Sequence, residues 1–142
     1  MKKNILLIVF LSLNIAFQSC KNESGQDIVG SKIQLEGLTF NNNEKWVANE
    51  ETHIGMQRID SILKNNNATD GNVLGNILSK ETSYIIKSCD MKGKAHDQLH
   101  IVLVPILEII TDLKDEKNTA EIDKKIKSLK QYTQAYFKYF KS

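Results

Sequence analysis

Four side chains that bind soft metals occur between Cys89 and His100, in the segment Cys89-Asp-Met-Lys-Gly-Lys-Ala-His-Asp-Gln-Leu-His100. His96 and His100 are four residues apart, and on a helix such side chains are neighbours at about 5–6 Å. A thiol, a thioether and two imidazoles together favour Cu(I), whereas zinc sites are built from thiolate, imidazole and carboxylate ligands. We therefore expect Cys89, Met91, His96 and His100 to bind one soft metal ion, with copper preferred.

A purely structural role for the same residues is the alternative. On a helical wheel the apolar stripe of this segment lies between Leu99 and Leu103, about 60° from His96 and about 100° from His100. Histidines at the boundary of a core often bond to a neighbour or to water. Cysteine and methionine are common buried residues. Both interpretations stay open at the level of sequence, and metal analysis separates them.

Four stretches after residue 49 have the apolar period of amphipathic helices. The first follows Asn49 as N-cap and ends at residues 65–67, and the second begins after Thr69 or Asp70. The third covers about residues 95–114, after a turn at Gly93. The fourth follows Asn118, whose spacing from Glu121 resembles a capping box.

The residues expected to point inward define how the helices pack. In the second helix they are Val73, Leu74, Ile77, Leu78 and Ile85, with Cys89 near its end. In the fourth they are Ile122, Ile126, Leu129, Thr133, Tyr136 and Phe140. Because the connecting segments are short and polar, we expect an all-α, up-down-up-down four-helix bundle over residues 41–142.

This topology would bring the candidate residues together at one pole of the bundle, where the first and third helices start and the second and fourth end. The residues gathered there would be Trp46, His53, Cys89, Met91, His96, His100, Tyr136, Phe137, Tyr139 and Phe140. His53 is thus a further candidate ligand. The aromatic residues are expected to pack the end of the bundle, and they would also shield a metal from water.

The amino-terminal residues have the pattern of a lipoprotein signal. Lys2 and Lys3 precede an apolar run that ends in Ala16-Phe-Gln-Ser-Cys20, and this predicts a signal peptide over residues 1–19. Cys20 is the expected lipidation site. It would anchor residues 20–40 as a tether, in which the alternating segment Ile33-Gln-Leu-Glu36 could either form one short extended strand or simply lie along the body of the domain. This places the protein in the bacterial cell envelope, and both the outer and the inner membrane are compatible with it.

Removal of residues 1–19 changes the charge of the chain. The full sequence has 19 basic and 17 acidic residues, and the signal peptide holds Lys2 and Lys3 and no acid, so the remainder is neutral. A neutral chain lacks the electrostatic attraction that nucleic-acid binding requires, and no nucleic-acid partner is expected.

The segment from Cys89 to His100 resembles a group of small envelope lipoproteins of Gram-negative bacteria. The resemblance is carried by Cys89, Met91, Gly93, His96, Asp97, Leu99 and His100. Trp46 ahead of Asn49 and Thr52 is also similar to that group. The resemblance covers about 100 residues and implies an anchored envelope protein, without implying an activity.

Three classes of function follow. A metal-binding lipoprotein, for copper handling or sensing, follows from the ligand set. A partner-binding or structural lipoprotein follows from the anchored bundle alone. A haem-binding bundle is third, because methionine and histidine are available as axial ligands although the CxxCH attachment motif is missing. We do not expect an enzyme, since no nucleophile–base–orienter set is visible.

Overall fold

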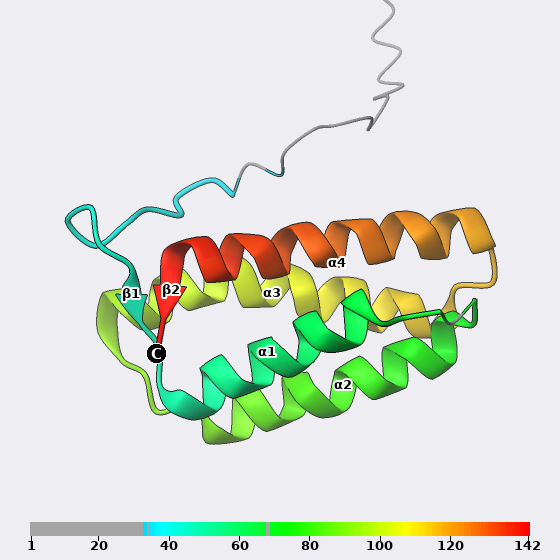
Figure 1. Cartoon of the computed structure of the whole chain (residues 1–142), viewed down its shortest axis with the longest axis horizontal. Coiled ribbons are helices and arrows are strands. Elements are labelled where there is room, and N and C mark those ends of the chain that lie inside the picture. Colours follow the sequence, from blue (N-terminus) through cyan, green and yellow to red (C-terminus); the bar gives the residue numbers. More distant parts are fainter. Residues whose placement is uncertain (1–32, 34, 68) are drawn as a thin grey trace, which may run out of the picture. The chain divides into compact units, whose positions relative to one another are not determined.

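The computed structural model describes residues 33, 35–67 and 69–142. The expected signal peptide and Cys20 lie outside the described residues. The helices run side by side in Figure 1 and are α1 (Glu50–Lys64), α2 (Gly71–Ser88), α3 (Gly93–Asp115) and α4 (Thr119–Tyr139). Each packs against its neighbours in sequence, and α1 also packs against α4, which closes the ring. The expected all-α, up-down-up-down four-helix bundle is confirmed. Of the helices in the described ranges, none is both long and apolar enough to cross a membrane.

Side chains at two helix starts hold backbone amides that lack a partner within the helix. Asp70 Oδ1 accepts from Asn72 N at 2.8 Å, which selects Asp70 over Thr69 as the cap of α2. Asn118 Oδ1 accepts from Ala120 N at 2.9 Å at the start of α4. Side-chain oxygens at this position satisfy donors that the first turn leaves free, which fixes where each helix begins.

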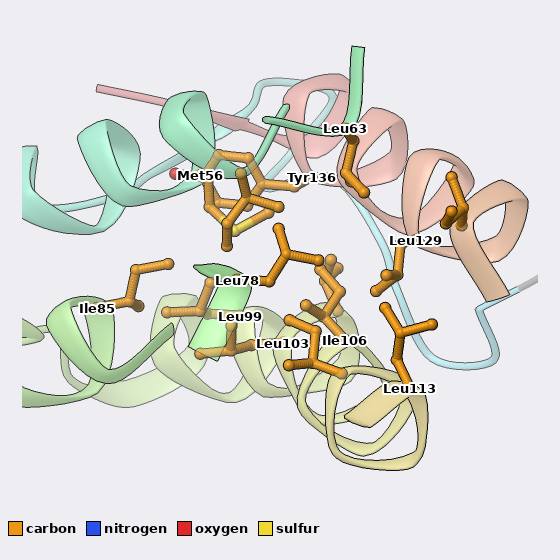
Figure 2. Packing of buried hydrophobic residues seen from close by; sticks show 14 of the residues in the cluster. Met56, Leu63, Leu78, Ile85, Leu99, Leu103, Ile106, Leu113, Leu129 and Tyr136 are labelled. Atoms are coloured by element: carbon orange, nitrogen blue, oxygen red, sulfur yellow. The ribbon is translucent and has the colours of Figure 1, made fainter. Parts of the chain in front are cut away.

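The core is one apolar cluster built from all four helices. Figure 2 shows its labelled side chains converging between the helices, with Met56 of α1 and Tyr136 of α4 facing residues of α2 and α3. Most contributing positions follow their predecessor by three, four or seven residues, as the 3.6-residue period requires. The largest fully buried side chains are Tyr136, Phe140, Met56, Ile59, Leu63, Leu74, Leu78, Ile85, Leu99, Ile106, Ile110 and Leu113.

The expected orientation of α2 is wrong at two positions. Val73 and Ile77 are 50% and 42% exposed, although both were expected to point inward. Instead α2 turns Gly71 and Gly75 into the bundle. A Cβ atom at Gly71 would lie only 2.4 Å from the carbonyl oxygen of Leu113 in α3. The two helix backbones approach closely because glycine has no side chain, and this contact rotates Val73 and Ile77 outward.

The strands of the described residues lie outside the segment at residues 33–36, which was expected either to form a short strand or to lie along the body. Ile33 and Leu35 lie outside any strand, and the strands in the described part of the chain are β1 (Trp46–Val47) and β2 (Phe140–Lys141). They pair in parallel, with Trp46 opposite Phe140, at the end of the bundle where Figure 1 marks the carboxyl terminus. Phe140 was expected in the fourth helix. It lies one residue beyond α4, in β2, and its side chain is still buried in the core.

Residues 35–40 pack against the bundle ahead of β1. Gln98 of α3 holds this segment at two points: its Oε1 atom accepts from Thr39 N at 2.7 Å, and its Nε2 atom donates to Gly37 O at 3.0 Å. Leu38 is buried in the core cluster. Trp46 Nε1 donates to Thr39 O at 2.7 Å and closes the turn that leads into β1. The polar and apolar contacts together attach the start of the domain to α3 and α4.

Candidate functional site

The expected pole of the bundle is formed by direct contacts between helix ends. Asn49, before α1, donates through Nδ2 to the carbonyl oxygen of Ser88 at the end of α2, at 2.9 Å. His53 in the first turn of α1 reaches Tyr136 near the end of α4, with 3.2 Å between Nδ1 and Oη. The Tyr136 ring stacks on Phe140 with centroids 5.0 Å apart. The prediction that these segments meet at one end is confirmed.

Cys89 and His96 are brought together across the turn between α2 and α3. Cys89 caps the end of α2, and its Sγ atom lies 3.7 Å from Nδ1 of His96 in the first turn of α3. Gly93 makes the reversal possible, since its φ of 61° lies in the left-handed region that favours glycine. Both side chains are partly exposed. The sequence pattern thus becomes a thiol–imidazole pair at the surface of the bundle.

His96 and His100 lie side by side on α3. Their ring centroids are 4.3 Å apart and the rings are tilted by 55°, as the four-residue spacing predicts. His96 is partly buried and His100 is exposed. The pair therefore borders the core rather than entering it, in agreement with the helical wheel. His100 can turn its ring toward or away from His96 without disturbing the core.

The other two candidate ligands have apolar or aromatic surroundings. Met91 is partly buried and packs against the core cluster. His53 contacts Tyr136, and its ring also meets Phe137 edge-on with centroids 5.6 Å apart. Among the residues that the structure describes, no group of three or more His, Cys, Asp and Glu side chains is arranged to hold a metal ion. The arrangement therefore offers one pair of donor atoms, Cys89 Sγ and His96 Nδ1, with His100 and Met91 as further candidate donors nearby.

The donor pair has a separation that a metal ion can span. With the zinc bond lengths of about 2.3 Å to sulfur and about 2.0 Å to nitrogen, ligand angles of roughly 110–120° correspond to about 3.5–3.7 Å between the two donors. The Sγ–Nδ1 distance of 3.7 Å falls in this range. An ion could therefore be held between Cys89 and His96 without a change in the backbone. In its absence the same distance suits a weak hydrogen bond involving sulfur.

Two groups at this pole have shifted pKa values. Burial raises the pKa of the Tyr136 hydroxyl strongly, and the nearby Cys89 raises it further. Partial burial lowers the pKa of His53 from 6.5, and the positive charge of Lys45 lowers it further. The Tyr136 hydroxyl therefore stays protonated and His53 stays neutral near neutral pH. Tyr136 and His53 are thus two uncharged polar groups on the side of the pole next to the thiol.

Tyr136 is the residue at this pole whose role the sequence did not reveal. It was expected as an apolar position of the fourth helix and as one of the aromatic residues that pack the pole, without a hydrogen-bond partner being assigned to its hydroxyl. The sequence could have indicated this role, because a tyrosine at an apolar position of a helix is buried and its hydroxyl then needs a hydrogen-bond partner. The partner is His53, which explains why that histidine lies at the pole without joining the Cys89–His96 pair.

Comparisons with known proteins identified no match to this chain among family models, curated proteins or solved structures.

Proposed function

We propose that this protein is an envelope lipoprotein whose helical bundle binds a soft metal ion, Cu(I) preferred, for metal handling or sensing. The observation that carries the proposal is the 3.7 Å separation of Cys89 Sγ and His96 Nδ1. Thiolate and imidazole are suitable ligands for copper, and thiolate in particular selects Cu(I) over harder ions. Cys89 and His96 act as the two primary ligands in this proposal.

His100 supplies a third donor. Its ring lies beside that of His96, with centroids 4.3 Å apart, and the side chain is exposed, so a change of rotamer can direct one of its nitrogens to an ion on Cys89 and His96. Met91 follows Cys89 by two residues and can complete the set with its thioether. His53 stays with Tyr136 and is a neighbour of the site rather than a ligand.

The exposure of the pair suits exchange of the ion better than permanent storage. Structural metal sites have a full set of protein ligands, whereas sites with fewer ligands keep positions open to other molecules. Cys89 and His96 are only partly buried. An ion held by them can accept a ligand from a second molecule before it leaves. This is the property that a metal-handling or metal-sensing protein needs.

The experiment is anaerobic competition for Cu(I) between the protein and a chromogenic chelator. We expect Cys89→Ser and His96→Ala each to weaken binding more than about tenfold, since loss of even an outer-shell partner typically costs 10–100-fold. His100→Ala should have a smaller effect. His53→Ala is the matched control, because it removes a histidine from the same pole while leaving the ligands in place.

Equal binding by the parent protein, Cys89→Ser and His96→Ala would contradict the proposal. The four candidate residues would then be structural, and a partner-binding lipoprotein without a metal would replace the metal-binding function. An equal loss in His53→Ala would show that the variants act through the packing of the pole rather than through ligation.

A further inference from the structure

The outer face of α4 carries a concentration of positive charge. The helix contains five lysines and two acids, whereas α3 contains two lysines and four acids. The exposed lysines of α4 are Lys124, Lys127, Lys130 and Lys138. At 100° per residue they fall within an arc of about 120°, on the side opposite the apolar stripe. They form one basic stripe along the helix, which we call the α4 lysine face.

Within α4, two acids stand against the four exposed lysines of the α4 lysine face. Asp123 falls within the arc, and Glu121 lies about 60° beyond Lys124, with which it pairs at 2.6 Å. The Lys124 side chain is still 61% exposed in that pair. Exposed ion pairs of this kind are weak and are readily exchanged for another anion. The stripe therefore keeps a net positive charge within a chain that is neutral after residue 19.

The start of the domain lies beside the same helix. Phe40 packs on Tyr139 at the end of α4, with ring centroids 4.5 Å apart, and Lys138 Nζ lies 5.8 Å from the Phe40 ring centroid. Figure 1 shows the segment before β1 running along the α4 side of the bundle. From the expected anchor at Cys20 to Leu35 the chain spans about 15 residues, which reach at most about 50 Å. A lipid at Cys20 would hold α4 within that distance of a membrane.

We propose that the α4 lysine face binds the anionic phospholipid headgroups of the membrane to which the chain is anchored. The charge complementarity and the attachment of the tether beside α4 support this partner. Basic residues near an anionic bilayer strengthen binding by about fivefold each, and the attraction falls off within a Debye length. The tether would raise the local concentration of headgroups at this face and so strengthen a contact that the lysines make by themselves. This inference does not depend on metal binding.

The contact would also orient the candidate metal site. The Cys89–His96 pair joins the end of α2 to the start of α3, and α2 lies across the ring from α4, since each packs against α1 and α3. With α4 on the headgroups, the α2–α3 side of the bundle faces the aqueous phase. The exposed His100 then stays accessible to a soluble partner or to a metal complex.

The test is sedimentation of the chain beginning at Lys21 with phospholipid vesicles. The described residues belong to a compact unit separate from residues 1–30, so this chain keeps its core. We expect binding to vesicles that mix zwitterionic and anionic phospholipids, little binding to purely zwitterionic vesicles, and loss of binding at high salt. The variant Lys124→Gln/Lys127→Gln/Lys130→Gln should bind the anionic vesicles at least about tenfold more weakly.

The matched control is Lys64→Gln/Lys80→Gln/Lys87→Gln, which removes the same charge from exposed positions of α1 and α2. It should change binding by less than about twofold, because those lysines lie on other helices than the α4 lysine face. Circular dichroism checks that both variants keep the helical fold. Absence of binding to anionic vesicles, or an equal loss in both variants, would overturn the proposal and leave the face to solvent or to a protein partner.

Discussion

At the residue scale, three histidines on this bundle have three different environments. His53 is bonded to Tyr136 and lies close to Lys45, so it is held neutral. His96 is partly buried with its Nδ1 atom directed at Cys89, and His100 is exposed beside it. Environment, rather than residue type, separates the structural histidine from the proposed metal ligands.

His53 should make the stability of the fold depend on pH. Its pKa in the folded state lies below 6.5, so the unfolded chain takes up a proton first as the pH falls. The free energy of unfolding therefore contains a His53 contribution that is fully present above pH 6.5 and is lost as the pH falls toward the pKa of the folded state. Urea unfolding at a series of pH values should show a shallower decline for His53→Gln than for the parent.

The control for that measurement is His100→Gln, which removes an exposed imidazole from another helix. An identical decline with falling pH in the parent and in His53→Gln would contradict the assignment of His53 as the group that is held neutral by its surroundings.

At the scale of the elements, the helix starts and one close helix contact define the bundle. Asp70 and Asn118 fix where α2 and α4 begin. Gly71 and Gly75 set how near α2 comes to α3, and thereby which face of α2 is buried. Since α2 ends at Cys89, the rotation and position of this helix determine where the thiol meets α3.

Replacement of the α2 cap should destabilise the bundle. Asp70→Ala removes the acceptor for Asn72 N and Val73 N, and loss of an N-cap costs about 0.5–2 kcal/mol. Thr69→Ala is the matched control, since Thr69 is exposed and precedes the cap. It should change the free energy of unfolding by less than about 0.5 kcal/mol. Chemical denaturation measures both, and a larger loss in Thr69→Ala would reverse the assignment of the cap.

Gly71→Ala tests the close approach of α2 and α3. The added Cβ atom would lie 2.4 Å from Leu113 O and 3.1 Å from Glu116 O, both backbone atoms that cannot rotate away. We expect a loss of about 1–3 kcal/mol in the free energy of unfolding, although alanine is the better helix former. Ser83→Ala at an exposed position of α2 is the control. A stabilised Gly71→Ala variant would show that the helices are farther apart than described.

At the scale of the whole molecule, the segment just before α1 and the carboxyl-terminal residues meet at the pole that carries the candidate site. β1 and β2 pair residues that are far apart in sequence, and Lys45 Nζ donates to Phe137 O at 2.7 Å beside them. The contact closes the bundle around Tyr136 and Phe140. It also joins the segment before α1 to the end of α4.

The sequence predicts the bundle well because helical periodicity is a local property. The apolar positions of α4 and the meeting of helix ends follow from it, while cap signals predicted Asn118 and narrowed the cap of α2 to Thr69 or Asp70. The pairing of Trp46 with Phe140 could not be read in this way, because two-residue strands have no detectable period. Val73 and Ile77 were misplaced for a related reason: the close contact at Gly71 depends on α3, which local pattern does not describe.

The candidate site was predictable in part. The spacing of His96 and His100 fixes their proximity on any helix, and the structure agrees. The approach of Cys89 to His96 depends on the conformation of Gly93, and the sequence indicated a turn there without giving its direction. The hydrogen bond between His53 and Tyr136 joins α1 to α4. A contact of this kind between two helices can be identified only in the packed structure.

Lipidation of Cys20 is a prediction from sequence alone, since this residue lies outside the described ranges. Mass spectrometry of the mature amino terminus should find residues 1–19 removed and Cys20 carrying two or three acyl chains. A Cys20→Ser variant should remain in the soluble fraction or keep its signal peptide. An unmodified Cys20 in native membranes would contradict the anchor, and with it the tethering that the α4 lysine face relies on.

The central claim, a soft metal ion on Cys89 and His96, is tested most directly by the metal content of the protein. The chain beginning at Lys21 would be purified without an affinity tag, under anaerobic and reducing conditions, from cells supplied with copper, and analysed for all transition metals. We predict a stoichiometric amount of copper in the parent protein and its loss in Cys89→Ser/His96→Ala, while His53→Ala retains it. A parent protein without copper, or equal copper in the parent and the double variant, would contradict the claim.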